Sequence, residues 1–179
     1  MIIGTFNGWS IVQRPAKPGI RQLDVTLTDS VGVTQSPFTM QTQTQQWPGA
    51  DWWEFDVTLP PMARAQAQQW IAFLAELRGM ANVFQMGDSY YQRPQGQPLG
   101  APVVDNSVTG SNQAMTTVLS TRGWPAGAHN LLLPGDLFQI GYRLHMVVGS
   151  AVVADASGKA QINVWPSLRE TPADGAALV

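Results

Sequence analysis

The sequence predicts a mainly β protein, an antiparallel β-sandwich or split barrel with one flanking α-helix. Three observations predict this class. Apolar and polar side chains alternate in several stretches, of which Leu137–Val148 is the longest, and this alternation is typical of half-buried strands. Only Met62–Arg78 has the period of an amphipathic helix. Turns rich in Pro and Gly separate these stretches, as expected for antiparallel strands.

The first strands are predicted on either side of a polar segment. Apolar residues alternate with polar ones in Arg21–Thr28 and again in Asp51–Leu59. Between them, Phe38–Gln46 (FTMQTQTQQ) alternates Thr and Gln with little apolar content, which indicates an edge strand or an extended arm. Residues 1–20 are a possible N-terminal arm, and both an arm and a part of the core stay open for residues 1–50. The apolar face of the second strand is expected to be Trp53, Phe55, Val57 and Leu59.

The helix is predicted over Met62–Arg78. Pro60 and Pro61 end the preceding strand. Proline also suits the start of a helix, because the first N–H groups of a helix have no intrahelical acceptor and proline lacks an N–H. Gly79 is expected to be the left-handed cap. We expect the helix to cover one face of a sheet through an apolar stripe formed by Ala63, Ala67, Trp70, Phe73, Leu74 and Leu77.

The middle of the chain is predicted to hold two short strands separated by a long loop. Asn82–Gly87 is the first strand, and Gln113–Ser120 is the second, with Met115, Thr117 and Leu119 on one face. Residues 92–112 are rich in Pro, Gly, Ser and Asn and lack any period. Aperiodic segments of this length are usually functional or disordered.

Leu137–Val148 is predicted to be one long, half-buried strand. A Pro134-Gly135-Asp136 turn precedes it, and a hairpin turn is expected at Asp155–Gly158. Gln139, Arg143 and His145 would lie on its polar face. Its apolar face would consist of Phe138, Ile140, Tyr142, Leu144, Met146 and Val148.

Composition predicts a single domain, residues 1–179, whose surface is largely covered by other subunits. Hydrophobic residues make up 44% of the chain, which supports a real core. Only 12% of residues are charged, against about 25% in typical proteins, so an isolated monomer would be poorly protected against association. A plain monomer of low charge is the alternative.

The same composition argues against several classes of function. The net charge of −2 argues against wrapping of nucleic acid. The absence of cysteine excludes disulfides and thiolate chemistry. No apolar run approaches 18 residues, and MIIGTFNGW lacks the basic and apolar regions of a signal peptide.

No residue pattern indicates catalysis, a metal or a cofactor, and we predict that the protein is not an enzyme. His129 lies in a turn and His145 on a polar strand face, and neither has partners at metal-ligand spacing. Glu54 and Asp56 point to the same side of a strand about 7 Å apart, a separation similar to that of the two catalytic carboxylates of glycosidases. Alternating acids are, however, ordinary on the solvent face of an antiparallel strand.

Outward aromatic and amide side chains are the predicted binding surface. Trp53 and Trp70 fall on apolar faces, whereas Trp52 points outward and Trp47 and Trp124 fall in turns. Protein interfaces favour such aromatics. A carbohydrate-binding module that uses Trp47, Trp52 and Trp124 is the alternative. The candidate interface residues are Trp47, Trp52, Trp124, Gln41, Gln43, Gln45, Tyr90 and Tyr91.

The order of these elements resembles a tail protein of long-tailed bacteriophages and prophages, most similar to the distal tail protein of the tail-tip ring. The resemblance runs over Asp51–Val179. WWEFDVTLPPM leads to a helix with QQWIAFLAELRG and to NVFQMGD; after the loop segment QRPQGQPLGAP, LLLPGDLFQIGYRLHMVV and ADASGKAQINVWPSLRETPADGAALV close the chain.

This resemblance implies a tail-tube-like β-sandwich that assembles as a homo-oligomeric, hexameric ring. Such a ring would connect the tail tube to the baseplate hub or tail fibres in the virion, after assembly in the cytoplasm of the bacterial host. DNA would pass through its lumen without specific binding. The tail-tube protein itself is the alternative within this class. FTMQTQTQQ and the 92–112 loop are the segments expected to make intersubunit contacts.

Overall fold

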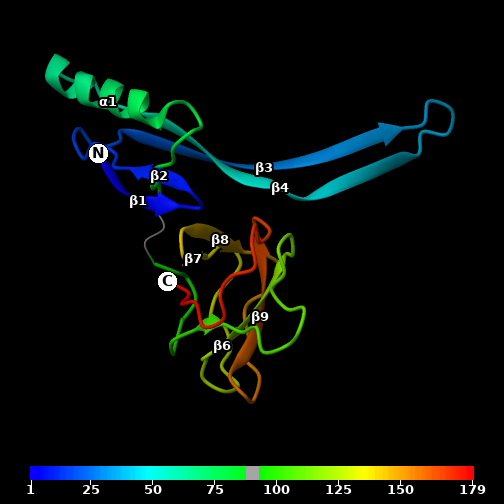
Figure 1. The fold of residues 1–179 in the computed structure, drawn as a ribbon. Coiled ribbons are helices and arrows are strands. Elements are labelled where there is room, and N and C mark those ends of the chain that lie inside the picture. Colours follow the sequence, from blue (N-terminus) through cyan, green and yellow to red (C-terminus); the bar gives the residue numbers. More distant parts are fainter. Residues whose placement is uncertain (88–92) are drawn as a thin grey trace. The chain divides into compact units, whose positions relative to one another are not determined.

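The computed structural model describes residues 1–87 and 93–179 and is mainly β (Figure 1). The predicted fold class is confirmed, because these residues form antiparallel sheets, one of them curled into a half-barrel, and one helix. Where the sequence predicts one domain, the contacts divide the chain into two compact units. The first contains Met1–Val25 and the described residues from Phe55 to Gly87; the second contains Thr26–Glu54 and the described residues from Arg93 to Val179.

The first unit begins with a β-hairpin. Strand β1 (Ile2–Phe6) pairs antiparallel with β2 (Trp9–Val12). Ile11 and Val12 are buried. Residues 2–12 are therefore paired and packed, and they do not extend as an arm.

Helix α1 (Arg64–Leu77) confirms the predicted helix, but it buries a narrower stripe than expected. Trp70, Phe73 and Leu77 are buried in a small core with Val12 of β2, and the rings of Trp70 and Phe73 meet edge to face. Leu74 is 60% exposed and Ala63 is exposed, contrary to prediction. The cap is also one residue earlier than predicted, because Arg78 adopts the left-handed conformation at the C-cap.

Strands β3 (Gln22–Gln35) and β4 (Thr42–Thr58) form a long two-stranded hairpin (Figure 1). The Ser36 N–H donates to the Gln41 carbonyl across the turn. The segment Phe38–Gln46 thus forms the turn and the first residues of β4, which continues through the predicted strand Asp51–Leu59. Both predicted strands are confirmed and are parts of longer ones.

The second unit contains a five-stranded sheet in the order β5-β6-β9-β8-β7. Its strands are β5 (Val103–Val104), β6 (Val118–Arg122), β7 (Leu137–Ile140), β8 (Arg143–Val147) and β9 (Lys159–Trp165). The inward side chains form the main core, which includes Val104, Leu119, Trp124, Leu131, Phe138, Val147, Ile162, Val164 and Leu168.

The predicted long strand Leu137–Val148 is wrong, because the chain reverses at Gly141-Tyr142 and forms the hairpin β7–β8. Gly141 has φ 58°, which suits the first position of a two-residue hairpin turn. Ile140 pairs with Arg143, and Phe138 with His145. Since directly paired residues share a face, the inward positions change from even numbers on β7 to odd numbers on β8. His145 is therefore buried, and Tyr142 is exposed.

Three smaller predictions between the helix and the closing strands are corrected. Asn82–Gly87 contributes only an isolated bridge at Val83 to Ile11. The loop 92–112 contains β5, so Val103 and Val104 belong to the sheet, and Val104 is fully buried in the core. Strand β6 begins later than predicted, because Met115 has φ 69° and is exposed. The turn at Asp155–Gly158 is confirmed, since the Asp155 carboxylate accepts hydrogen bonds from the Ser157 and Lys159 N–H groups.

Candidate functional site

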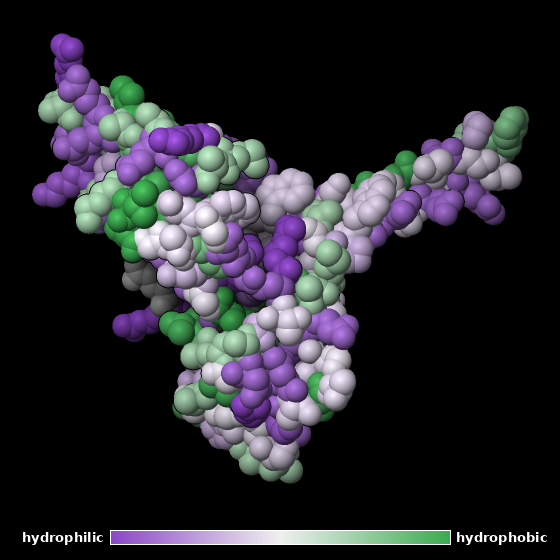
Figure 2. Space-filling view, in the orientation of Figure 1, coloured by the Kyte–Doolittle hydropathy of each residue, from purple (hydrophilic) through white to green (hydrophobic). Residues whose placement is uncertain are grey.

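The most unusual surface is the outer part of the β3–β4 hairpin, residues 30–50, which we call the hairpin arm. Ser30–Ala50 contains no charged residue, and Phe38 in its turn is 93% exposed. Figure 2 shows hydrophobic atoms at the end of the arm and mixed hydropathy along it. The exposed large apolar residues of the arm are Val31, Val33, Phe38, Met40 and Trp47.

The arm also presents unpaired strand edges. The sheet that β3 and β4 form has only these two strands among the residues the structure describes, so each strand keeps one open edge. Proteins usually protect such edges with charged side chains or proline. Here the arm lacks charge, and Pro48 is the only proline within its strands. The arm can therefore accept a further strand or an apolar partner surface.

The predicted interface residues are only partly brought together. Gln41, Gln43 and Gln45 are exposed on the arm, and Trp47 is 48% exposed near its base. Trp52, further along β4, is 43% exposed. Tyr90 and Tyr91 lie outside the described residues.

The prediction that Trp124 is an interface residue is wrong. Its side chain is only 5% exposed and belongs to the main core. The indole Nε1 donates to the Thr121 hydroxyl over 2.8 Å. The Gly/Pro-rich sequence around Trp124 does indicate a turn, but this turn folds inward, which local sequence does not reveal.

A polar clasp attaches the base of the arm to the segment after β9. The Asp51 carboxylate is buried and accepts hydrogen bonds from the Ser167 N–H, at 2.5 Å, and from the Ser167 hydroxyl, at 2.7 Å. The Arg169 guanidinium donates to the carbonyls of Gly49 and Asp51. Bonds between residues so distant in sequence set the position of the arm base on the sheet. Nothing in the spacing of these residues indicates the clasp.

Two tryptophans extend this attachment along β4. The rings of Trp53 and Trp165 meet edge to face, with centroids 4.6 Å apart. The Trp53 indole donates to the Leu144 carbonyl, and the Trp165 indole donates to the Asp29 carboxylate. These contacts agree with the predicted inward position of Trp53. The ring packs against Trp165, and the indole N–H keeps a hydrogen-bond partner, as buried tryptophans usually do.

A groove of about 690 Å³ lies beside the arm base. Its walls come from β4, from β6 and β9, and from the loop before β6. The residues that line it are Gln46, Trp47, Pro48, Gly49, Asp51, Val108, Thr109, Gly110, Ser111, Asn112, Met115, Thr116, Thr117, Val118, Ser120, Gln161 and Ser167.

The structure places the two histidines in different environments and bonds Glu54 to a neighbouring strand. The His145 Nδ1 lies 3.0 Å from the Pro166 carbonyl, and burial lowers the pKa of His145. His129 is exposed. Glu54 accepts a hydrogen bond from Thr28 on the neighbouring strand. Within residues 1–87 and 93–179, no three His, Asp or Glu side chains gather as a metal site.

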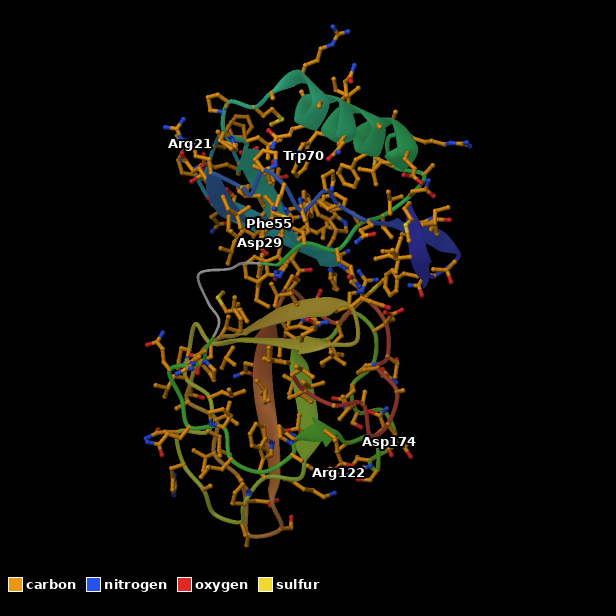
Figure 3. The ribbon with its side chains drawn as sticks, turned by 90° about the vertical axis from the view of Figure 1, so that its left-hand side faces the viewer. Arg21, Asp29, Phe55, Trp70, Arg122 and Asp174 are labelled. Atoms are coloured by element: carbon orange, nitrogen blue, oxygen red, sulfur yellow. The ribbon has the colours of Figure 1, made fainter. Side chains whose placement is uncertain are left out.

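The remaining acidic cluster is neutralised by cations. Arg122 lies 2.9 Å from the Asp174 carboxylate (Figure 3). It also lies 2.9 Å from the Asp105 carboxylate. Lys159 lies 2.8 Å from the buried Asp105 carboxylate. Hydrogen bonds from Lys159, and further ones from Ser107, hold the pKa of Asp105 well below its usual range. The cluster fastens β5, β6 and β9 to the C-terminal segment, and its acids are already paired.

Asp105 makes stability sensitive to acid. Because its pKa is lower in the folded protein than in the unfolded chain, where it is about 3.9, this group stabilises the fold above that pH. The contribution is lost as the pH falls below about 4. Urea unfolding between pH 7 and pH 2.5 should show a steeper acid loss of stability in the native protein than in Asp105→Asn. Equal pH slopes would contradict this assignment.

Comparison with known proteins adds no assignment to this geometry. A scan against protein-family models gave no match, and neither did a search of the curated proteins. No helix in the described part of the chain is long and apolar enough to cross a membrane.

Proposed function

We propose that this protein is a structural component of a phage tail tip, which forms a homo-oligomeric ring between the tail tube and the baseplate hub or fibres. The resemblance of Asp51–Val179 to distal tail proteins motivates the proposal. The hairpin arm is the observation that carries it. In this assignment the ring is hexameric, and DNA passes through its lumen without specific binding.

The arm supports assembly because it is poorly suited to solvent on its own. A two-stranded hairpin without a covering layer is marginally stable in water. This one exposes Phe38 and Met40 at its turn and lacks any charge over Ser30–Ala50. Contact with a neighbouring copy would bury the apolar side chains and pair the open edges. A head-to-tail contact of this kind, repeated by rotation, closes a ring.

The weakly acidic chain suits passage of DNA. A net charge of −2 with few cations provides little attraction for phosphates. The tail-tube protein remains the second candidate, since the same arm would serve stacking of successive rings. Electron microscopy separates the two candidates: a tip component forms single rings, whereas a tube protein forms long tubes.

The direct test is the oligomeric state of the purified protein. Light scattering and negative-stain electron microscopy at micromolar concentration should show a ring. A monomer that persists at high concentration would sink the proposal.

A matched pair of double variants tests the role of the arm. Gln43→Lys with Gln45→Lys places two charges on the exposed arm and should shift the ring towards monomer, because the contact with a neighbouring copy would have to bury these charges. Gln68→Lys with Gln69→Lys makes the same chemical change on exposed positions of α1 and should leave the ring intact. Loss of the ring only in the α1 variant would reject the arm as the contact.

A further inference from the structure

The groove at the arm base has features of a ligand site that assembly does not require. Its volume of about 690 Å³ falls within the range of about 300–1,000 Å³ typical of ligand pockets. All its walls belong to the second compact unit of one chain. One copy of the protein therefore forms the whole groove, and the groove does not depend on what the arm contacts.

Trp47 provides an aromatic wall whose position is set by a neighbouring glycine. A Cβ atom added to Gly32 of β3 would lie 2.7 Å from the Trp47 ring. Only the missing side chain lets the ring lie this close to the β3 backbone. Trp47 is 48% exposed and lines the groove, so part of this residue is open to a ligand.

The groove offers no attraction for a charged ligand. Among the described residues that line it there is no lysine or arginine, and the one acid, Asp51, accepts two hydrogen bonds from Ser167. Arg169, next to Gly49, is occupied by two backbone carbonyls. A phosphate or carboxylate would find no cation, and an ammonium group would compete for a carboxylate already in use.

The polar lining consists of neutral hydroxyl and amide groups. Some of them are committed, since the Asn112 amide donates to the Ser120 carbonyl and accepts from the Ser120 N–H. Gln161, Thr117 and Gln46 are exposed in the groove and can donate and accept towards a ligand. A wholly apolar ligand would leave such groups without partners, which costs free energy.

An added peptide strand also fits this wall poorly. Strands β6 and β9 are neighbours in the interior of the five-stranded order. They present side chains to the groove and have no free edge there for strand addition. A half-exposed tryptophan in the same groove as neutral donors and acceptors instead matches a sugar ring, which has an apolar face and a rim of hydroxyls.

We infer that this groove binds a neutral oligosaccharide, with a sugar ring stacked on Trp47 and its hydroxyls hydrogen-bonded by Gln161, Thr117 and Gln46. This inference goes beyond the proposed role in a tail ring and does not depend on it. A protein of the tail tip with such a groove would contact uncharged glycan as well as its own copies.

The test is binding of neutral oligosaccharides to the intact protein. A glycan array of uncharged oligosaccharides selects the probe, and calorimetry with maltotriose, cellotriose and chitotriose measures affinity. Binding of at least one neutral glycan is expected, and Trp47→Ala should weaken it about tenfold or more, equivalent to about 1.4 kcal/mol. Absence of any binding across the array would overturn the inference.

Matched variants separate the groove from the rest of β4. Trp52→Ala removes another exposed tryptophan, which is not in the groove, and should leave affinity unchanged. Gly32→Ala keeps every groove side chain but displaces the Trp47 ring, so it should weaken binding, as should Gln161→Ala. Binding that resists Trp47→Ala and Gln161→Ala would place the glycan elsewhere and reject the groove. The arm variant Gln43→Lys with Gln45→Lys should still bind glycan, which keeps this test separate from that of the ring.

Discussion

Replacement of Trp124 with alanine is expected to lower the free energy of unfolding by about 3–5 kcal/mol, the usual cost of removing a large aromatic side chain from a core. Trp124 is 5% exposed, and its indole is bonded to the Thr121 hydroxyl, which in turn donates to the Ala160 carbonyl. The variant would leave a cavity in the main core and remove the Thr121 partner. Urea unfolding followed by circular dichroism measures the loss.

Trp52→Ala is the matched control for this prediction. Trp52 is 43% exposed and lies outside both buried clusters, so its removal should change the free energy of unfolding by about 0.5 kcal/mol or less. If Trp124→Ala proved as mild as Trp52→Ala, the assignment of Trp124 to the core would be wrong.

Asp51→Ala is expected to cost about 2–3 kcal/mol, because it leaves buried donors of Ser167 without a partner. The Ser167 N–H and hydroxyl both donate to the Asp51 carboxylate, and the backbone at Asp51 also receives Arg169. Loss of the carboxylate should loosen the base of the hairpin arm from the segment after β9. Faster hydrogen exchange at the Ser167 amide would report this local effect alongside the unfolding measurement.

Asp51→Asn separates shape from charge at the same position. Asparagine keeps one acceptor oxygen and nearly the same volume, so it should retain more stability than alanine but less than the native residue. Full native stability in both variants would mean that the clasp contributes nothing to the fold.

The periodicity of the sequence was sufficient to predict those strands and that helix whose apolar and polar faces are visible within one continuous segment. Alternation in Arg21–Thr28 and Asp51–Leu59 correctly predicts strands, since all but the end residues Arg21 and Leu59 lie within β3 and β4. The stripe with Trp70, Phe73 and Leu77 correctly predicts α1. The exposed glutamines of Phe38–Gln46 also follow from sequence, because a segment with few apolar residues has little to bury.

Local pattern failed where the partner of a segment decides its conformation. A two-residue turn at Gly141-Tyr142 does not interrupt the alternation of Leu137–Val148. One long strand and a hairpin therefore have the same sequence pattern. Cross-strand pairing then buries His145, whose polar side chain suggested solvent. The described part of the 92–112 loop has no period, yet Val104 pairs with β6 and enters the core.

The candidate site was predictable in its composition but not in its arrangement. The amino-acid sequence was sufficient to predict a mainly β chain with one helix, a polar edge strand or arm at Phe38–Gln46, and outward tryptophans as candidate interface residues. Tertiary contacts alone place Trp124 in the core, Trp47 over Gly32 and the Asp51 carboxylate against Ser167. The physical reason is that periodicity reports which side chains share a face of one element, whereas burial and pairing depend on residues of other elements, such as Ser167, which lies 116 positions from Asp51.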